Sequence, residues 1–185
     1  MLAFLRLRCL LCRAARLQKN GRWRIAPAED GARSSRRYWD DTLILKTRFE
    51  TASGTVALID FMPPRYNTSD VVRMVRCLRG KVKMRMELII RFGFGNDIPW
   101  VKRTEDRSAL LVICGQDMAV LRTPVATRGE ELTTVADFEV SAGETIPFVL
   151  SYAPSHLPPP KPLDPAAALQ ETRDFWTDWC SRCSY

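Results

Sequence analysis

A strict two-residue alternation between Val82 and Phe92 constrains the fold more than any other feature of the chain. Successive side chains of a strand point to opposite faces, whereas an amphipathic helix repeats its apolar side every three or four residues. The segment therefore predicts a β-strand with one buried face, and only Ile89 interrupts its polar side. The apolar positions are Val82, Met84, Met86, Leu88, Ile90 and Phe92, and the charged positions are Lys83, Arg85, Glu87 and Arg91.

Neighbouring segments predict strands that pair with their neighbours in sequence. Val71–Leu78 is strand-like, and Arg79-Gly80 after it reads as a turn, so we expect this strand to pair with the one that begins at Val82. Thr42–Phe49 and Val56–Phe61 flank the short loop Ala52-Ser53-Gly54, which is the pattern of a β-hairpin.

Many short strand-like runs separated by glycine and polar residues are typical of an all-β sandwich. The chain is therefore predicted to be mainly β, with an antiparallel β-sandwich over residues 20–153. The remaining strand-like runs are Arg22–Ile25, Ile98–Arg103, Ala109–Cys114, Met118–Arg122, Thr133–Val140 and Pro147–Tyr152.

The character of the sequence changes at Pro154. Residues 154–164 form a Pro-rich linker, with four prolines between Leu157 and Pro162. Asp164-Pro165 then predicts a helix over 165–185, because Asp is a preferred N-cap and proline a preferred first helical residue. One face of this helix recurs every three or four residues, at Leu169, Thr172, Trp176, Trp179 and Cys183. Its two tryptophans need a partner surface, either on the sandwich or on another domain.

Charge is distributed unevenly. Residues 1–37 carry ten of the 28 basic side chains but only two of the 21 acidic ones, so the net charge of +7 arises from this stretch. The folded part is close to neutral, which argues against a nucleic-acid-binding protein. Eight basic residues between Arg65 and Arg91 face only Asp70 and Glu87, and we interpret most of them as solvated strand positions rather than a binding patch. No apolar run approaches the roughly 20 residues that span a bilayer, so no membrane partner is expected.

The six cysteines include two C-x-x-C pairs, Cys9/Cys12 and Cys180/Cys183. These pairs are much farther apart than the pairs of usual zinc ribbons, so we expect neither a metal nor a cofactor. Cys77 and Cys114 lie in apolar strands and are expected to behave as small hydrophobic residues. Reduced thiols of this kind favour a cytoplasmic location.

Residues suited to hydrolytic chemistry are few. His156, the only histidine, lies in the linker and is expected to be solvated. Gly93-Phe94-Gly95 lacks the spacing of a phosphate-binding loop and reads as a turn or bulge. The adjacent pairs Asp40-Asp41 and Glu130-Glu131 would point to opposite faces of a strand, unlike the facing carboxylates of a glycosidase. Asp60 is expected to hold backbone amides. No catalytic residue is assigned, and the substrate-binding residues remain unknown.

Aromatic side chains are the other mark of carbohydrate recognition. Each candidate is either a platform for a sugar ring or, more commonly in a small β-domain, part of the core. The candidates are Tyr38-Trp39, Phe92, Phe94 and Trp100.

A set of phrases in order resembles the non-catalytic N-terminal β-domain of family 15 glycoside hydrolases, the glucoamylase and trehalase-like enzymes. The resemblance covers nearly all of residues 20–185. The chain departs from the family at Gly93-Phe94, where Asp-Tyr is frequent, and in residues 1–19, which lack the acidic, Trp-containing opening of the family. The phrases are NGRWRIAPAEDGAR, TRFETASGTVALIDFMPPR, KVKMRMELIIRFGFG with its PW, and RDFWTDWCSRCSY.

The resemblance implies a supersandwich-like β-domain of an inverting enzyme that hydrolyses α-glucosidic bonds of starch-type oligosaccharides or trehalose. In such enzymes the catalytic glutamates lie in a helical barrel, which follows the helix and packs on the β-domain. We therefore expect a domain that is inactive alone and has the barrel of its parent enzyme as partner. A free-standing carbohydrate-binding module is the alternative. Residues 1–19 are an atypical extension: a misassigned start, a frameshifted stretch or a gene-fragment edge, a targeting segment, or a native helix.

Overall fold

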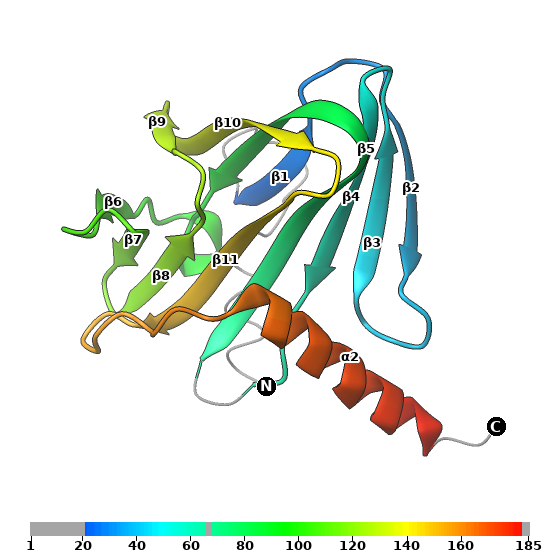
Figure 1. Cartoon of the computed structure of the whole chain (residues 1–185). Helices are drawn as coiled ribbons and strands as arrows, with labels where there is room; N and C mark the ends of the chain where they lie inside the picture. The colour runs from blue at the N-terminus through cyan, green and yellow to red at the C-terminus, as the bar shows by residue number, and fades with distance from the viewer. Residues whose placement is uncertain (1–20, 66–67, 183–185) are drawn as a thin grey trace.

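The computed structural model describes residues 21–65 and 68–182. Within these ranges eleven antiparallel strands form one hydrogen-bonded network, followed by one α-helix (Figure 1), so the predicted mainly-β sandwich with a C-terminal helix is confirmed. The predicted helix end and the Cys9, Cys12 and Cys183 thiols lie outside the described residues. The strands are β1 Arg22–Pro27, β2 Arg33–Tyr38, β3 Leu45–Glu50, β4 Gly54–Phe61, β5 Ser69–Ile89, β6 Trp100–Arg103, β7 Ala109–Cys114, β8 Asp117–Arg122, β9 Arg128–Glu130, β10 Thr133–Ser141 and β11 Thr145–Pro154; the helices are the 3₁₀ turn η1 Gly93–Gly95 and α2 Pro165–Ser181.

One 21-residue strand, β5, belongs to both layers of the sandwich. Its first half pairs with β4 and β11 in the layer ordered β2-β3-β4-β5-β11-β8-β7-β6. Its second half pairs with β1 on one side and β10 on the other, and β9 extends this second layer beyond β10. Figure 1 shows β5 curving from one layer into the other.

The predicted turn at Arg79-Gly80 is wrong, and so is the predicted pairing of the strands on either side of it. The chain remains extended through these residues and bends instead of reversing. Gly80 has a φ of 76°, which is the left-handed region that glycine adopts without strain. It faces Gly54 of β4, and the register shifts one residue later, between Thr55 and Val56. Gly80 thus allows an irregular bend within the strand and not a chain reversal.

The other predicted strands are confirmed with small shifts at their ends. The hairpin is formed by β3 and β4, with Phe49 opposite Val56. Its first strand begins at Leu45, and the preceding Leu43 is exposed, whereas Ile44 is buried. The sequence did not predict β2 or the three-residue β9.

The main core lies between the two layers. All six apolar positions between Val82 and Phe92 are buried, as their alternation predicted. They pack against buried side chains of β4, β7, β8 and β11, and Phe138 of β10 contacts Phe148 of β11 with ring centroids 5.4 Å apart. The layers are thus held by one continuous apolar contact, the main source of stability in such a domain.

Candidate functional site

The first half of α2 is docked on the outer face of the larger layer. The Asp164 carboxylate accepts hydrogen bonds from the backbone N–H groups of Ala166 and Ala167, at 2.9 and 3.3 Å, so the predicted N-cap is confirmed. Ala168 and Thr172 are buried one turn apart. They face a second apolar cluster, which contains Ile44, Ile59, Phe61, Val72, Met74 and Val149.

The turn between β2 and β3 contacts the second half of α2. Two cations lie over the ring of Trp39, with Lys46 Nζ 3.1 Å and Arg173 Cζ 5.4 Å from the ring centroid. Burial, followed by the nearby charge of Arg37, lowers the pKa of Lys46. Near the end of α2 the thiol of Cys180 donates to the carbonyl oxygen of Asp41 at 3.0 Å. Trp39, a candidate sugar platform, is therefore occupied by protein groups.

The outward side of the second half of α2 carries aromatic rings. Phe175 is 42% and Trp179 55% exposed, while Trp176 is half-buried. Phe175 makes an edge contact with Trp176 and a stacked contact with Trp179, with centroids 5.2 and 6.2 Å apart. In Figure 1 the C-terminal turns of α2 project away from the sheets. The sandwich thus covers only part of the aromatic surface. We call Phe175, Trp176 and Trp179 the helix aromatic cluster.

A pocket of about 470 Å³ lies at the opposite, open end of the sandwich. Its walls come from β6 and β7 of the larger layer and from β9, β10 and the end of β5 in the smaller layer. Trp100 lines it and is 86% exposed, so this candidate aromatic is a surface residue and not part of the core. Arg103 of β6 donates to the carbonyl and, at 3.0 Å, to the hydroxyl oxygen of Thr127, which ties the two walls together.

Arg91 lines this pocket, and its burial corrects the prediction that it occupies a solvated strand position. It follows the end of β5 and is only 5% exposed. Its Nη1 donates to the carbonyl oxygen of Ile90 at 2.8 Å. Burial lowers the pKa of Arg91, and within the described part of the chain no ion pair offsets this effect. No local pattern indicates this role, because Arg91 falls in register with the charged positions Lys83, Arg85 and Glu87 of the strand.

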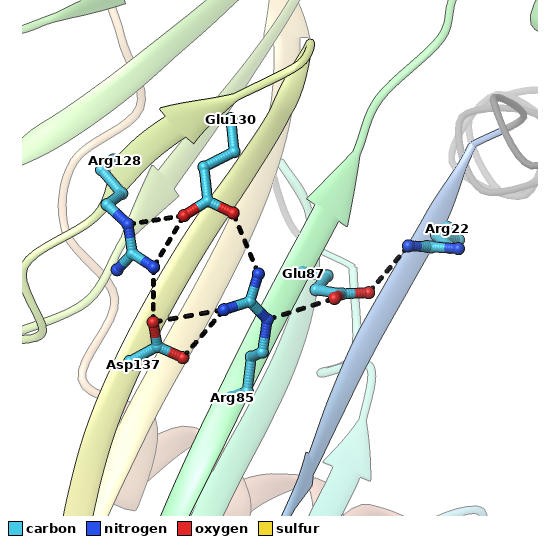
Figure 2. A network of polar contacts seen from close by, with 6 residues as sticks. All are labelled: Arg22, Arg85, Glu87, Arg128, Glu130 and Asp137. Carbon is cyan, nitrogen blue, oxygen red and sulfur yellow. Dashed lines mark hydrogen bonds and ion pairs between the residues drawn. The ribbon is translucent and has the colours of Figure 1, made fainter. Parts of the chain in front are cut away.

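Glu130, one of the candidate carboxylates, belongs to an ionic network on the outer face of the smaller layer (Figure 2). Arg85 of β5 is central: it donates to Glu130 at 2.9 Å, to Asp137 at 3.2 Å and to Glu87 at 3.2 Å. Three cations thus balance three carboxylates across four strands. The six residues are Arg22, Arg85, Glu87, Arg128, Glu130 and Asp137.

The charges of this network suit a structural role better than catalysis. Hydrogen bonds from Arg128 and then Arg85 hold the pKa of Glu130 below its usual value. Arg128 similarly lowers the pKa of the Asp137 carboxyl. A general acid of a glycosidase needs the opposite shift, because it must remain protonated near neutral pH. Glu131, the candidate next to Glu130, is exposed in the turn between β9 and β10 and has a positive φ of 44°.

Asp60 holds an arginine and not the backbone amides that were predicted. Its two oxygens accept from Nε and Nη2 of Arg73 at 2.9 and 3.0 Å. Arg73 also donates to the carbonyl oxygen of Trp23 at 2.6 Å and lies over the Trp23 ring at 5.2 Å. The pair therefore connects β4 and β5 of one layer with β1 of the other. The sequence could not reveal this contact, because Arg73 lies 13 residues from Asp60 and 50 residues from Trp23.

The remaining candidates are dispersed. His156 is exposed in a turn after β11, as expected, and Phe92 is in the core. Gly93–Gly95 forms the 3₁₀ turn η1, which leaves Phe94 exposed. Tyr38 is exposed at the end of β2, and Asp40 has a φ of 47° in the following turn.

The thiols and the acidic groups form no recognisable metal centre within the described ranges. Cys77 is buried and Cys114 partly buried, in agreement with their predicted packing role. Among residues 21–65 and 68–182, no group of three His, Cys, Asp or Glu side chains has the arrangement of a metal site. Over the same residues, α2 and η1 are too short or too polar to cross a membrane.

Comparison with known proteins assigns the family. No match was found among the curated proteins. Among solved structures, a protein described as a kojibiose phosphorylase from the human microbiome is similar over 95% of this chain, with 10% identity and a TM-score of 0.49; the chain spans 28% of the length of that protein. The family model for trehalase-like N-terminal domains matches residues 14–154. The chain therefore belongs to the family of trehalase-like N-terminal domains.

Proposed function

We propose that this chain is the non-catalytic β-domain of a family 15, glucoamylase-like or trehalase-like glycoside hydrolase. The enzyme would act on α-glucosidic bonds of starch-type oligosaccharides or trehalose. In this proposal the domain supports a helical catalytic barrel of the same parent enzyme and contacts it through the helix aromatic cluster. Membership of the trehalase-like N-terminal family supports the assignment to carbohydrate-active enzymes.

The exposure of Phe175 and Trp179 is the observation that carries the proposal. Adjacent exposed aromatic rings on a helix mark a contact surface, because their burial against a partner removes apolar area from water. At roughly 25 cal/mol per Å², each ring that becomes buried contributes on the order of 1 to 3 kcal/mol. The docked half of α2 holds the helix in place, so the cluster is presented on a rigid support.

The state of the candidate carboxylates supports the non-catalytic part of the proposal. Asp60 is engaged by Arg73, and Glu130 is engaged by Arg85 and Arg128. An inverting hydrolase needs two carboxyl groups roughly 6.5 to 9.5 Å apart with space for a water molecule between them. Glu130, held in ion pairs that lower its pKa, does not meet this requirement, and both oxygens of Asp60 are already bound by Arg73.

The test is binding to a separately expressed helical catalytic domain from a family member, measured by calorimetry. We expect the wild-type chain to bind, and the double variant Phe175→Ser/Trp179→Ser to lose at least about tenfold in affinity. The double variant Phe94→Ser/Trp100→Ser is a matched control, since it removes the same residue types from another exposed surface. Equal loss in both variants, or release of glucose from maltose or trehalose by the chain alone, would contradict the proposal.

A carbohydrate-binding module is the second candidate, and the exposure of Trp100 beside a pocket favours it. If the chain is such a module, maltooligosaccharides should quench the tryptophan fluorescence of the wild type and not that of Trp100→Phe.

We also propose a cytoplasmic location, supported by three free thiols at Cys77, Cys114 and Cys180. Fractionation of cells that express the complete parent enzyme tests this location.

A further inference from the structure

The pocket at the open end of the sandwich has a one-sided charge. Its described lining includes four basic residues and no acidic one. Arg103 is engaged by Thr127, and Arg128 is engaged by Glu130 and Asp137 in the ionic network. Lys102 is exposed, and Arg91 is the buried member of the set. The lining therefore favours an anionic ligand over a neutral or cationic one.

The buried guanidinium of Arg91 provides an independent reason. An arginine remains protonated in proteins, and a charge removed from water is unfavourable unless a partner compensates it. The single hydrogen bond of Arg91, to the carbonyl of Ile90, uses one of its five N–H donors. Nothing in the described chain supplies a counter-charge. A phosphoryl or carboxylate oxygen in the pocket would supply a counter-charge and accept from guanidinium N–H groups that have no protein acceptor in the described chain.

The rest of the lining suits a ring with hydroxyl groups. The indole of Trp100 offers an exposed flat face, and Ile98, Val101 and Leu132 extend the apolar surface. Thr133 and Thr134, at the start of β10, line the opposite wall. A volume of about 470 Å³ falls at the lower end of the range for small-ligand pockets, which is suitable for a monosaccharide with one substituent.

We propose that this pocket binds a phosphorylated monosaccharide, with the phosphoryl group on Arg91 and the sugar ring against Trp100. The contacts come from the end of β5, from β6 and from the start of β10, which only the folded sandwich brings together. The helix aromatic cluster makes no part of the pocket. This inference therefore holds or fails independently of the proposed docking surface.

Calorimetric titration of the purified chain with glucose 6-phosphate tests the proposal. Glucose, inorganic phosphate and AMP are titrated in parallel, since they carry the ring alone, the anion alone and the anion with a flat aromatic ring. We expect glucose 6-phosphate to bind more tightly than each of the others. Arg91→Met should weaken its binding about tenfold or more, the effect of a lost charge-assisted hydrogen bond. Trp100→Ala should weaken it about threefold to tenfold.

A control variant and a stability measurement separate loss of the site from loss of the fold. Arg79→Met removes an exposed arginine near the bend of β5, away from the pocket, and should leave binding unchanged. Arg91→Met should melt at the same or a higher temperature than the wild type without ligand, because it removes a buried unpaired charge. Glucose 6-phosphate should raise the melting temperature of the wild type and not that of Arg91→Met.

Three results would overturn the proposal. The first is no binding of glucose 6-phosphate at millimolar concentration. The second is equal affinity for glucose and glucose 6-phosphate, which would show that the phosphoryl group does not contribute to binding. The third is tighter binding of AMP, which would show that Trp100 selects a planar base and not a sugar.

Discussion

Replacement of Gly80 by alanine should destabilise the domain more than replacement of a glycine in an open loop. Gly80 has a φ of +76°, and a Cβ added there would lie 2.9 Å from Cα of Gly54 and closer still to the carbonyl oxygen of Ser53. Two separate costs therefore act at one position: a left-handed backbone and an overlap with backbone atoms that cannot rotate away.

Two other glycines isolate these costs. Gly143 has a φ of +87° and no atom within 4 Å of the added Cβ, so Gly143→Ala carries the conformational cost alone, roughly 1 to 2 kcal/mol. Gly54 has no positive φ, but its added Cβ would lie 2.9 Å from Cγ2 of Val82 and closer to the carbonyl oxygen of Arg79. Gly54→Ala therefore carries the steric cost alone, roughly 1 to 3 kcal/mol. Gly80→Ala should lose about 2 to 5 kcal/mol, near the sum of the two.

The assay is urea unfolding of the four proteins, followed by circular dichroism and tryptophan fluorescence. The free energies of unfolding should rank wild type first and Gly80→Ala last, with the two single-cost variants between them. A Gly80→Ala protein as stable as Gly143→Ala would refute the reasoning, because it would show that β4 and β5 do not approach closely at this bend.

Three further predictions concern charge, capping and packing. Because Glu130 and Asp137 have pKa values lowered from 4.5 and 3.8, their stabilising effect is present above these values and is lost as pH falls through the lowered ones. Unfolding free energy should thus fall more for the wild type than for Glu130→Gln/Asp137→Asn between roughly pH 5 and 2, and equal slopes would argue against the network. Asp164→Ala should cost about 1 kcal/mol and speed hydrogen exchange in the first turn of α2, since it removes the N-cap; unchanged exchange there would contradict the cap. Phe148→Ala should cost about 3 to 5 kcal/mol in urea unfolding, because Phe148 is fully buried between the layers, and a loss below about 1 kcal/mol would contradict that packing.

Much of the β architecture could be predicted because one face of most strands is buried. The alternation from Val82 onward identified the inner face of β5, and Asp164-Pro165 identified the start of α2. In contrast, β2 has the sequence RSSRRY and is exposed at every position. It is an edge strand held by backbone hydrogen bonds to β3, and no apolar pattern marks such a strand.

The candidate sites were less predictable, because contacts distant in sequence create them. Trp100 was identified as a candidate from its residue type, but its exposure depends on the position of β6 at the edge of the larger layer. Arg91 was assigned to a solvated face by its alternation with Ile90. The chain leaves β5 at Ile89, so the alternation no longer reports burial beyond that point. The arginine that engages Asp60 also lies on another strand, and no local pattern connects the two.

Because β5 belongs to both layers, the register of its side chains is fixed along the whole strand. Insertion or deletion of one residue near Gly80 would turn every later side chain of the strand through half a turn and place Met84 and Met86 in water. The length of this 21-residue strand is therefore constrained by both layers at once.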